Sequence, residues 1–138
     1  MGTHRLLEHT ADMGIEASGE TPEELFAQAA YALLEIIAST PQAAAREERT
    51  VTLTAADPEE LLVNWLNEVL YLFENQRFFP VDFEIEEVRG NRLLARVSGE
   101  PFDPQRHLVE REVKAVTYHQ LRLEKSDGMW CARVYVDL

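Results

Sequence analysis

Residues 81–97 predict a complete β-hairpin; their sequence is Val-Asp-Phe-Glu-Ile-Glu-Glu-Val-Arg-Gly-Asn-Arg-Leu-Leu-Ala-Arg-Val. In the first half, Val81, Phe83 and Ile85 alternate with acidic residues, which is typical of a half-exposed strand. Arg89-Gly90-Asn91-Arg92 is a turn signal, and alternating apolar residues resume at Leu93. Since a short turn joins antiparallel strands, this stretch favours an antiparallel sheet.

Two helices are predicted upstream of the hairpin. Thr21 is the expected N-cap of the first, with Pro22 at its first position and Glu24 completing a capping box. Asp57 and Pro58 repeat this start for the second helix. The second helix is apolar over a broad surface, which predicts packing on two sides and places Trp65 in the core. Its apolar residues are Leu61, Leu62, Trp65, Leu66, Val69, Leu70, Leu72 and Phe73.

The remaining segments complete an α+β pattern. Further strands are predicted at residues 5–9, 13–19, 46–56, 113–123 and 129–138. The order is then ββαβαββββ, with hairpin-length connections among the last four strands. We therefore expect a single domain over residues 1–138, with a mainly antiparallel sheet and two main helices.

Composition limits the classes of function. The chain has 138 residues, a net charge of −12 and one cysteine. The negative charge disfavours direct binding to nucleic acid and favours a cation or a basic partner. Without an export signal, a membrane-spanning segment or a disulfide, a cytoplasmic protein is expected. Cys131 is expected to be a small buried apolar residue.

Two anionic groups at the end of the last predicted strand suggest a metal site. The predicted last strand ends with Asp137 and Leu138, whose carboxylate and main-chain oxygens are typical ligands of a hard cation. Asp12 follows the first predicted strand, where it could also cap local main-chain N–H groups. A solvated strand end is the alternative for Asp137 and Leu138.

Other polar residues have both a structural and a functional interpretation. In an extended strand, Glu112, Lys114, Val116 and Tyr118 share one face and Val113 and His119 lie on the other, which makes His119 a core histidine or a ligand. Lys114 is either a surface ion-pair partner or a charge beside carboxylates. His9 is expected to be an ordinary hydrogen-bonded histidine, and Glu68 is either exposed or drawn toward a cation.

Four motifs together resemble the archease family. They are Glu-His-Thr-Ala-Asp-Met-Gly-Ile at 8–15, Trp-Leu-Asn-Glu-Val-Leu-Tyr at 65–71, Glu-Val-Lys-Ala-Val-Thr-Tyr-His at 112–119, and the ending Trp130 to Asp137-Leu138. They occur in the family's order over the whole chain. Met13 and Leu138 replace the commoner isoleucines, which leaves the apolar character and a main-chain ligand at 138 unchanged.

The resemblance implies an archease-like fold and an accessory role rather than an enzyme. Archeases assist the GTP-dependent RNA ligase that joins 2′,3′-cyclic phosphate or 3′-phosphate ends to 5′-hydroxyl ends in tRNA splicing and RNA repair. They promote guanylylation of the ligase and its multiple turnover. The family's divalent cation, calcium with magnesium or manganese as alternatives, would be held here by Asp12, Asp137 and Leu138. The implied partner surface comprises Lys114, Glu112, His9, His119 and Glu68.

Two other functions fit the residues. A metal-dependent phosphoester hydrolase would use Asp12, Asp137 and His119 around an open coordination position. A general chaperone-like module for nucleic-acid enzymes would present a large apolar patch. The hydrolase would turn over phosphoesters alone, and the chaperone would not depend on Asp12.

Overall fold

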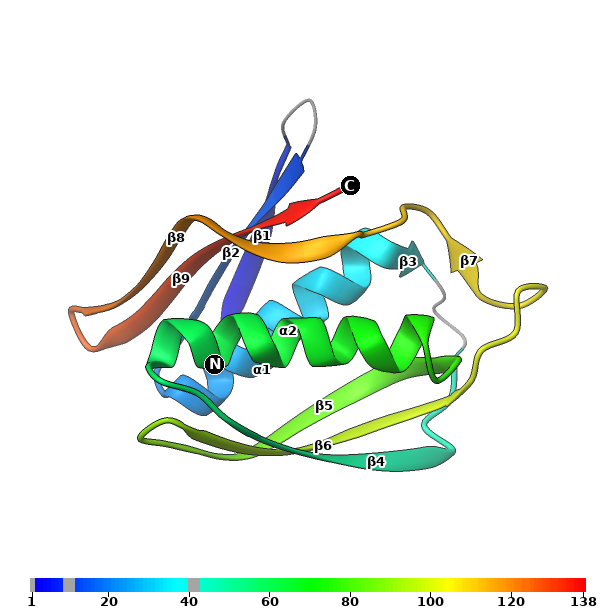
Figure 1. The fold of residues 1–138 in the computed structure, drawn as a ribbon, viewed down its shortest axis with the longest axis horizontal. Helices are drawn as coiled ribbons and strands as arrows, with labels where there is room; N and C mark the ends of the chain where they lie inside the picture. The colour runs from blue at the N-terminus through cyan, green and yellow to red at the C-terminus, as the bar shows by residue number, and fades with distance from the viewer. Residues whose placement is uncertain (1, 9–11, 40–42) are drawn as a thin grey trace.

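The fold places two helices between two antiparallel sheets (Figure 1). The computed structural model describes residues 2–8, 12–39 and 43–138. Each helix contacts strands of both sheets, so the core lies on two sides of the helical layer. Within these residues, no helix has the length and apolar character needed to cross a bilayer.

The larger sheet joins the two ends of the chain. Its strand order is β1 (Thr3–Glu8), β2 (Asp12–Gly19), β9 (Met129–Asp137) and β8 (Ala115–Ser126). Every neighbouring pair is antiparallel. The pairing of β2 with β9 therefore brings residues near position 12 beside residues near position 137.

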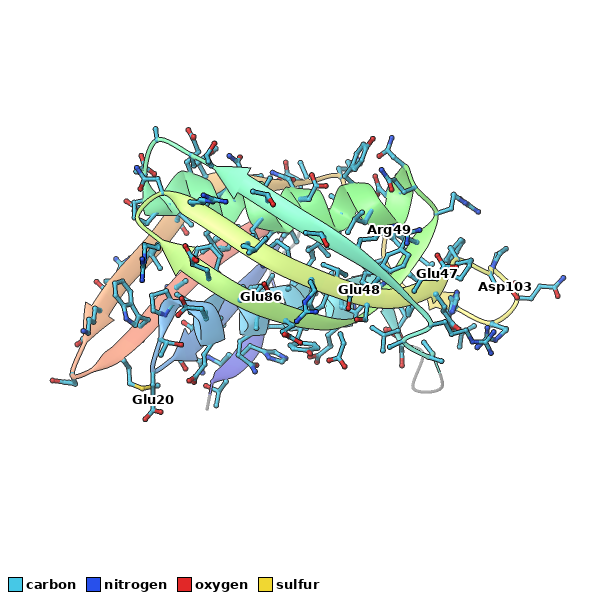
Figure 2. All side chains as sticks on the ribbon, turned by 90° about the horizontal axis from the view of Figure 1, so that it is seen from below. Glu20, Glu47, Glu48, Arg49, Glu86 and Asp103 are labelled. Carbon is cyan, nitrogen blue, oxygen red and sulfur yellow. The ribbon has the colours of Figure 1, made fainter. Side chains whose placement is uncertain are left out.

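The smaller sheet contains the predicted hairpin. It has the order β4 (Glu47–Thr54), β6 (Arg92–Pro101) and β5 (Phe78–Arg89). Gly90 adopts a left-handed conformation with φ of 59° at the turn, which a glycine adopts without strain. Figure 2 shows the sheet from its outer side, where Glu48 and Glu86 are labelled.

The helices α1 (Pro22–Ile37) and α2 (Pro58–Glu74) begin as predicted. The Thr21 hydroxyl accepts a hydrogen bond from the Glu24 amide at 3.1 Å, and Asp57 caps α2 in the same way. Trp65 is fully buried, and its indole N–H donates to the main-chain oxygen of Phe26 at 3.0 Å. The predictions of two-sided packing for α2 and of Trp65 in the core are confirmed.

The structure confirms a single α+β domain with two main helices and antiparallel strand pairing. Two of its strands were not predicted. β3 (Ala38–Ser39) and β7 (Leu108–Val109) pair with each other as a separate two-stranded sheet. A two-residue strand is too short to show alternation. The sequence pattern also gave no signal that the other strands divide between two sheets.

β8 departs most from its predicted pattern. Strict alternation would place Val113 and Val116 on opposite faces of the strand, but both are buried. The alternation does not extend to Val113 because regular pairing begins only at Ala115. A large bulge follows: Thr117 pairs with Tyr135, but the next paired residue is Arg122. The bulge exposes His119, so the interpretation of His119 as a core histidine is wrong.

Candidate functional site

Two aspartates lie directly opposite each other at one end of the larger sheet. Asp12 opens β2 and Asp137 closes β9, and they are register partners. Partner residues point to the same face of a sheet, with Cβ atoms about 4.5–5.5 Å apart. Successive residues of a strand point to opposite faces, and the adjacent residues Met13 and Val136 belong to the core. The side chains of Asp12 and Asp137 therefore lie on the outer face of the sheet. We call Asp12, Asp137, Leu138 and Lys114 the aspartate edge.

Packing and main-chain contacts hold this edge in place. The Lys114 amide donates to the main-chain oxygen of Asp137 at 2.9 Å. Leu138 is partly buried against the core, and Val113 is only 1% exposed. Because apolar residues anchor both neighbouring segments, the oxygens of Asp137 and Leu138 have a fixed position relative to Asp12.

Lys114 and Glu112 project outward on either side of buried Val113, and both are exposed. Glu112 faces the end of α2: burial, followed by the charge of Glu112, raises the pKa of Glu74. Lys114 therefore lies close to Asp137, and the carboxylates of Glu112 and Glu74 lie toward the end of α2.

Asn67 fixes helix α2 to the edge of β8. Its Oδ1 accepts from the Val116 amide at 3.2 Å, and its Nδ2 donates to the Val116 main-chain oxygen at 3.5 Å. An asparagine side chain can make both bonds at once, so it replaces a neighbouring strand at this position. This role of Asn67 was not predicted; its signal in the sequence is a single amide side chain on a broadly apolar helix.

The other predicted site residues lie around the edge or outside the described part. The His119 ring contacts Tyr135 at a centroid distance of 6.1 Å, one outward-facing position along β9 from Asp137. Glu68 lies next to Asn67 on α2 and is half-buried; among the described residues it makes no hydrogen bond or ion pair with the aspartate edge. His9 lies outside the described residues.

The donor set of the aspartate edge fits a hard divalent cation. Two carboxylates directly across a strand pair repel each other, and a cation that bridges them removes this repulsion. The main-chain oxygen of Leu138 can supply a further ligand at the same corner. Within residues 2–8, 12–39 and 43–138, no cluster of three His, Cys, Asp or Glu side chains forms a metal-binding group.

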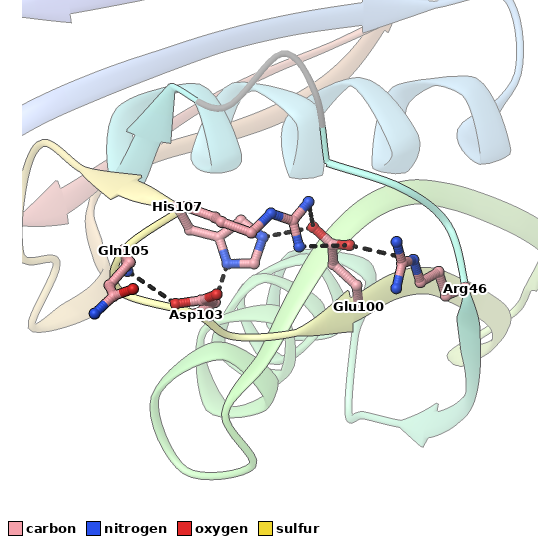
Figure 3. Close-up of polar contacts among 6 residues, drawn as sticks. Arg46, Glu100, Asp103, Gln105 and His107 are labelled. Carbon is pink, nitrogen blue, oxygen red and sulfur yellow. Dashed lines mark hydrogen bonds and ion pairs between the residues drawn. The ribbon is translucent and has the colours of Figure 1, made fainter.

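A second polar cluster, which no sequence motif indicated, is buried at the end of the smaller sheet (Figure 3). Glu100 and His107 are each 1% exposed, and the His107 Nε2 lies 2.6 Å from the Glu100 carboxylate. The Nδ1 of His107 accepts from the Asp103 amide at 2.8 Å, so Nε2 carries the proton and donates to Glu100.

Aromatic stacking and arginines complete this cluster. The His107 ring stacks on Phe79 at 4.1 Å, and Arg106 reaches the Glu100 carboxylate at 3.1 Å. The hydrogen bond from His107, followed by Arg106, lowers the pKa of Glu100 despite burial. We conclude that these contacts fasten the segment between β6 and β7 to the core.

Comparisons with known proteins agree with this architecture. The Archease protein family (MTH1598/TM1083) matches residues 4–138. The chain is 46% identical to the Methanosarcina mazei protein archease, covering 98% of this chain and 95% of the relative, and 38% identical to the Methanopyrus kandleri protein archease, covering 96% of each.

Two solved structures share the fold. The solution structure of Methanobacterium thermoautotrophicum protein 1598 has a TM-score of 0.81 and 34% identity over 98% of each chain. The crystal structure of a Thermotoga maritima archease, described as a possible chaperone, has a TM-score of 0.65 and 26% identity, covering 96% of this chain and 94% of that one. From the family match and these identities, the chain belongs to the archease family.

Proposed function

We propose that this protein is a cation-dependent accessory protein that activates a GTP-dependent RNA ligase in the cytoplasm. In this role it promotes guanylylation of the ligase and its multiple turnover during tRNA splicing or RNA repair. Family membership supports the partner, and the aspartate edge supports the dependence on a cation. The protein itself catalyses no reaction in this proposal.

The single observation that carries the proposal is the register of Asp12 with Asp137. The two residues are 125 positions apart, yet the sheet sets their carboxylates opposite each other on an outer face. Since like charges in this position destabilise a sheet, the pair is best explained by a bound cation. Calcium is the proposed ion, held by Asp12, Asp137 and Leu138, and magnesium or manganese would meet the same oxygen ligands.

The surface around the cation is the proposed contact with the ligase. Lys114 is exposed, and its main-chain amide is hydrogen-bonded to Asp137. Its positive charge would therefore lie next to the cation on the surface that a partner contacts. Glu112 and His119 flank the same outer surface, and Glu68 and His9 are proposed as further contributors. This acidic surface would dock against basic groups of the ligase.

The experiment measures guanylylation of the purified partner ligase from radiolabelled GTP. Wild-type protein with calcium should accelerate formation of the covalent guanylate, whereas Asp12→Asn should lose most of this stimulation. Asp127→Asn is the matched control, because Asp127 lies in the β8–β9 turn of the same sheet and asparagine tolerates its positive φ of 53°.

Equal stimulation by wild type and Asp12→Asn would refute the role of the aspartate edge. If no archease variant stimulates the ligase, the accessory role itself is wrong. Phosphoester hydrolysis by the purified protein alone would instead establish the hydrolase alternative.

A further inference from the structure

The outer face of the larger sheet carries a row of arginines. Arg5, Glu16, Arg133 and Arg122 are successive register partners across β1, β2, β9 and β8, so their side chains share one face. We call these four residues the arginine row. Three guanidiniums therefore lie in one line in a chain with 25 acidic and 13 basic residues.

Glu16 holds two of these arginines in place without using all their donors. The Arg5 Nε donates to Glu16 at 2.5 Å, and Arg133 donates through Nε at 3.1 Å and through Nη2. These contacts, with the Arg5 hydrogen bond first, lower the pKa of Glu16. Among the described residues, the terminal nitrogens of Arg5 and the whole Arg122 guanidinium have no hydrogen-bond partner.

The row borders an open cavity of about 410 Å³ on the outer face. The neighbouring set of register partners on the same face also lines the cavity. It consists of Thr3 and Ser18, whose hydroxyls are 2.9 Å apart, followed by Cys131 and Glu124. Cys131 is half-buried here rather than a buried core residue, so that prediction is wrong. A cavity of this volume is within the range of small-ligand sites.

We propose that the arginine row binds the phosphate group of a small molecule of about mononucleotide size. Guanidinium groups present several N–H donors in a plane and bind phosphate through paired hydrogen bonds. The three arginines outnumber Glu16 and Glu124, so the cavity keeps a positive charge that a phosphate neutralises. The hydroxyl row beside them can hydrogen-bond the remainder of the ligand.

This site is separate from the aspartate edge. Arg133 and Asp137 lie on the same face of β9, four residues apart, which is roughly 13 Å at about 3.3 Å per residue. A cation ligated at about 2.3–2.6 Å by the aspartates cannot also coordinate a phosphate at the row. Phosphate binding should therefore persist in Asp12→Asn, which makes failure of this inference distinguishable from failure of the proposed function.

The test titrates the purified protein with inorganic phosphate, a nucleoside 5′-monophosphate and the unphosphorylated nucleoside, and observes arginine Nε–H signals by NMR. Inorganic phosphate and the monophosphate should each cause saturable shifts of the signals of Arg5, Arg122 and Arg133. Neither ligand should shift the signal of Arg96. Arg96 is the matched control, since it also lies on an exposed sheet and pairs with Glu84 and Glu86.

Substitution then tests the row directly. Arg122→Gln leaves the contacts of Glu16 intact and should weaken binding of the monophosphate about 10-fold or more, whereas Arg96→Gln should not change it. The proposal is overturned if the row shows no saturable shift, if Arg122→Gln binds as wild type does, or if binding of the nucleoside matches that of its monophosphate. A monophosphate that binds no more tightly than inorganic phosphate would overturn the assigned ligand size.

Discussion

Substituting Asp12 by asparagine should have opposite effects on stability with and without a divalent cation. The change keeps the shape of the side chain and removes one of two charges that face each other across β2 and β9. Without a cation, the like-charge repulsion disappears and the variant should be more stable than wild type. With calcium, the variant should lose the ligand and become the less stable protein.

The structure sets the size of both effects. Two charges about 5 Å apart repel by about 0.8 kcal/mol in a water-like environment and by about 3 kcal/mol at an effective dielectric constant of 20. Asp137 is exposed and Asp12 is half-buried, so the lower end applies. We expect a gain of about 1 kcal/mol, or roughly 2–4 °C in melting temperature for a chain of this size. Calcium at 100 times its dissociation constant would stabilise wild type by about 2.7 kcal/mol, which reverses the order.

The assay is urea and thermal unfolding of both proteins in chelator and in excess calcium, with Asp127→Asn as the control for loss of one charge in the same sheet. The control should respond to calcium as wild type does. The reasoning is refuted if calcium stabilises Asp12→Asn as much as wild type, or if wild type does not respond to calcium.

Three further predictions concern positions that support the site. Trp65→Phe loses the hydrogen bond to the Phe26 oxygen and part of a filled core, so unfolding in urea should show a loss of about 1–3 kcal/mol. Asn67→Leu removes both bonds to the edge of β8 and should cost about 1–3 kcal/mol while increasing hydrogen exchange at that edge. Glu100→Gln should cost about 1.5–3 kcal/mol near neutral pH. Because the folded pKa of Glu100 is lowered, its contribution is complete above the unfolded value of about 4.3 and is lost as pH falls through the folded value, so the variant and wild type should converge in acid. A difference that stays constant down to pH 2–3 would contradict this explanation.

Local patterns in the sequence were enough to predict most elements. The capping residues Thr21 and Asp57 act on their own helices, and the turn at Gly90 joins adjacent strands, so short-range chemistry determines them. The broad apolar surface of α2 likewise predicted contact with two layers. The resemblance to archeases, rather than a local pattern, implied that Asp12 and Asp137 share a cation, and the two residues are register partners.

Long-range contacts determine what the sequence patterns did not show. The bulge in β8 depends on how β9 pairs with it, and strict alternation therefore misplaced His119. The buried pair of Glu100 and His107 forms only when the loop between them folds over Phe79. The arginine row combines residues from four strands, so no local window contains it.

Multiple-turnover RNA ligation is the most direct test of the central claim that the aspartate edge activates a ligase. The partner ligase would be assayed with this protein below stoichiometry, comparing wild type, Asp12→Asn, a variant that lacks Leu138, and Asp127→Asn. We predict strong stimulation by wild type and Asp127→Asn, and little by the other two. Full stimulation by Asp12→Asn and by the variant without Leu138 would contradict the claim.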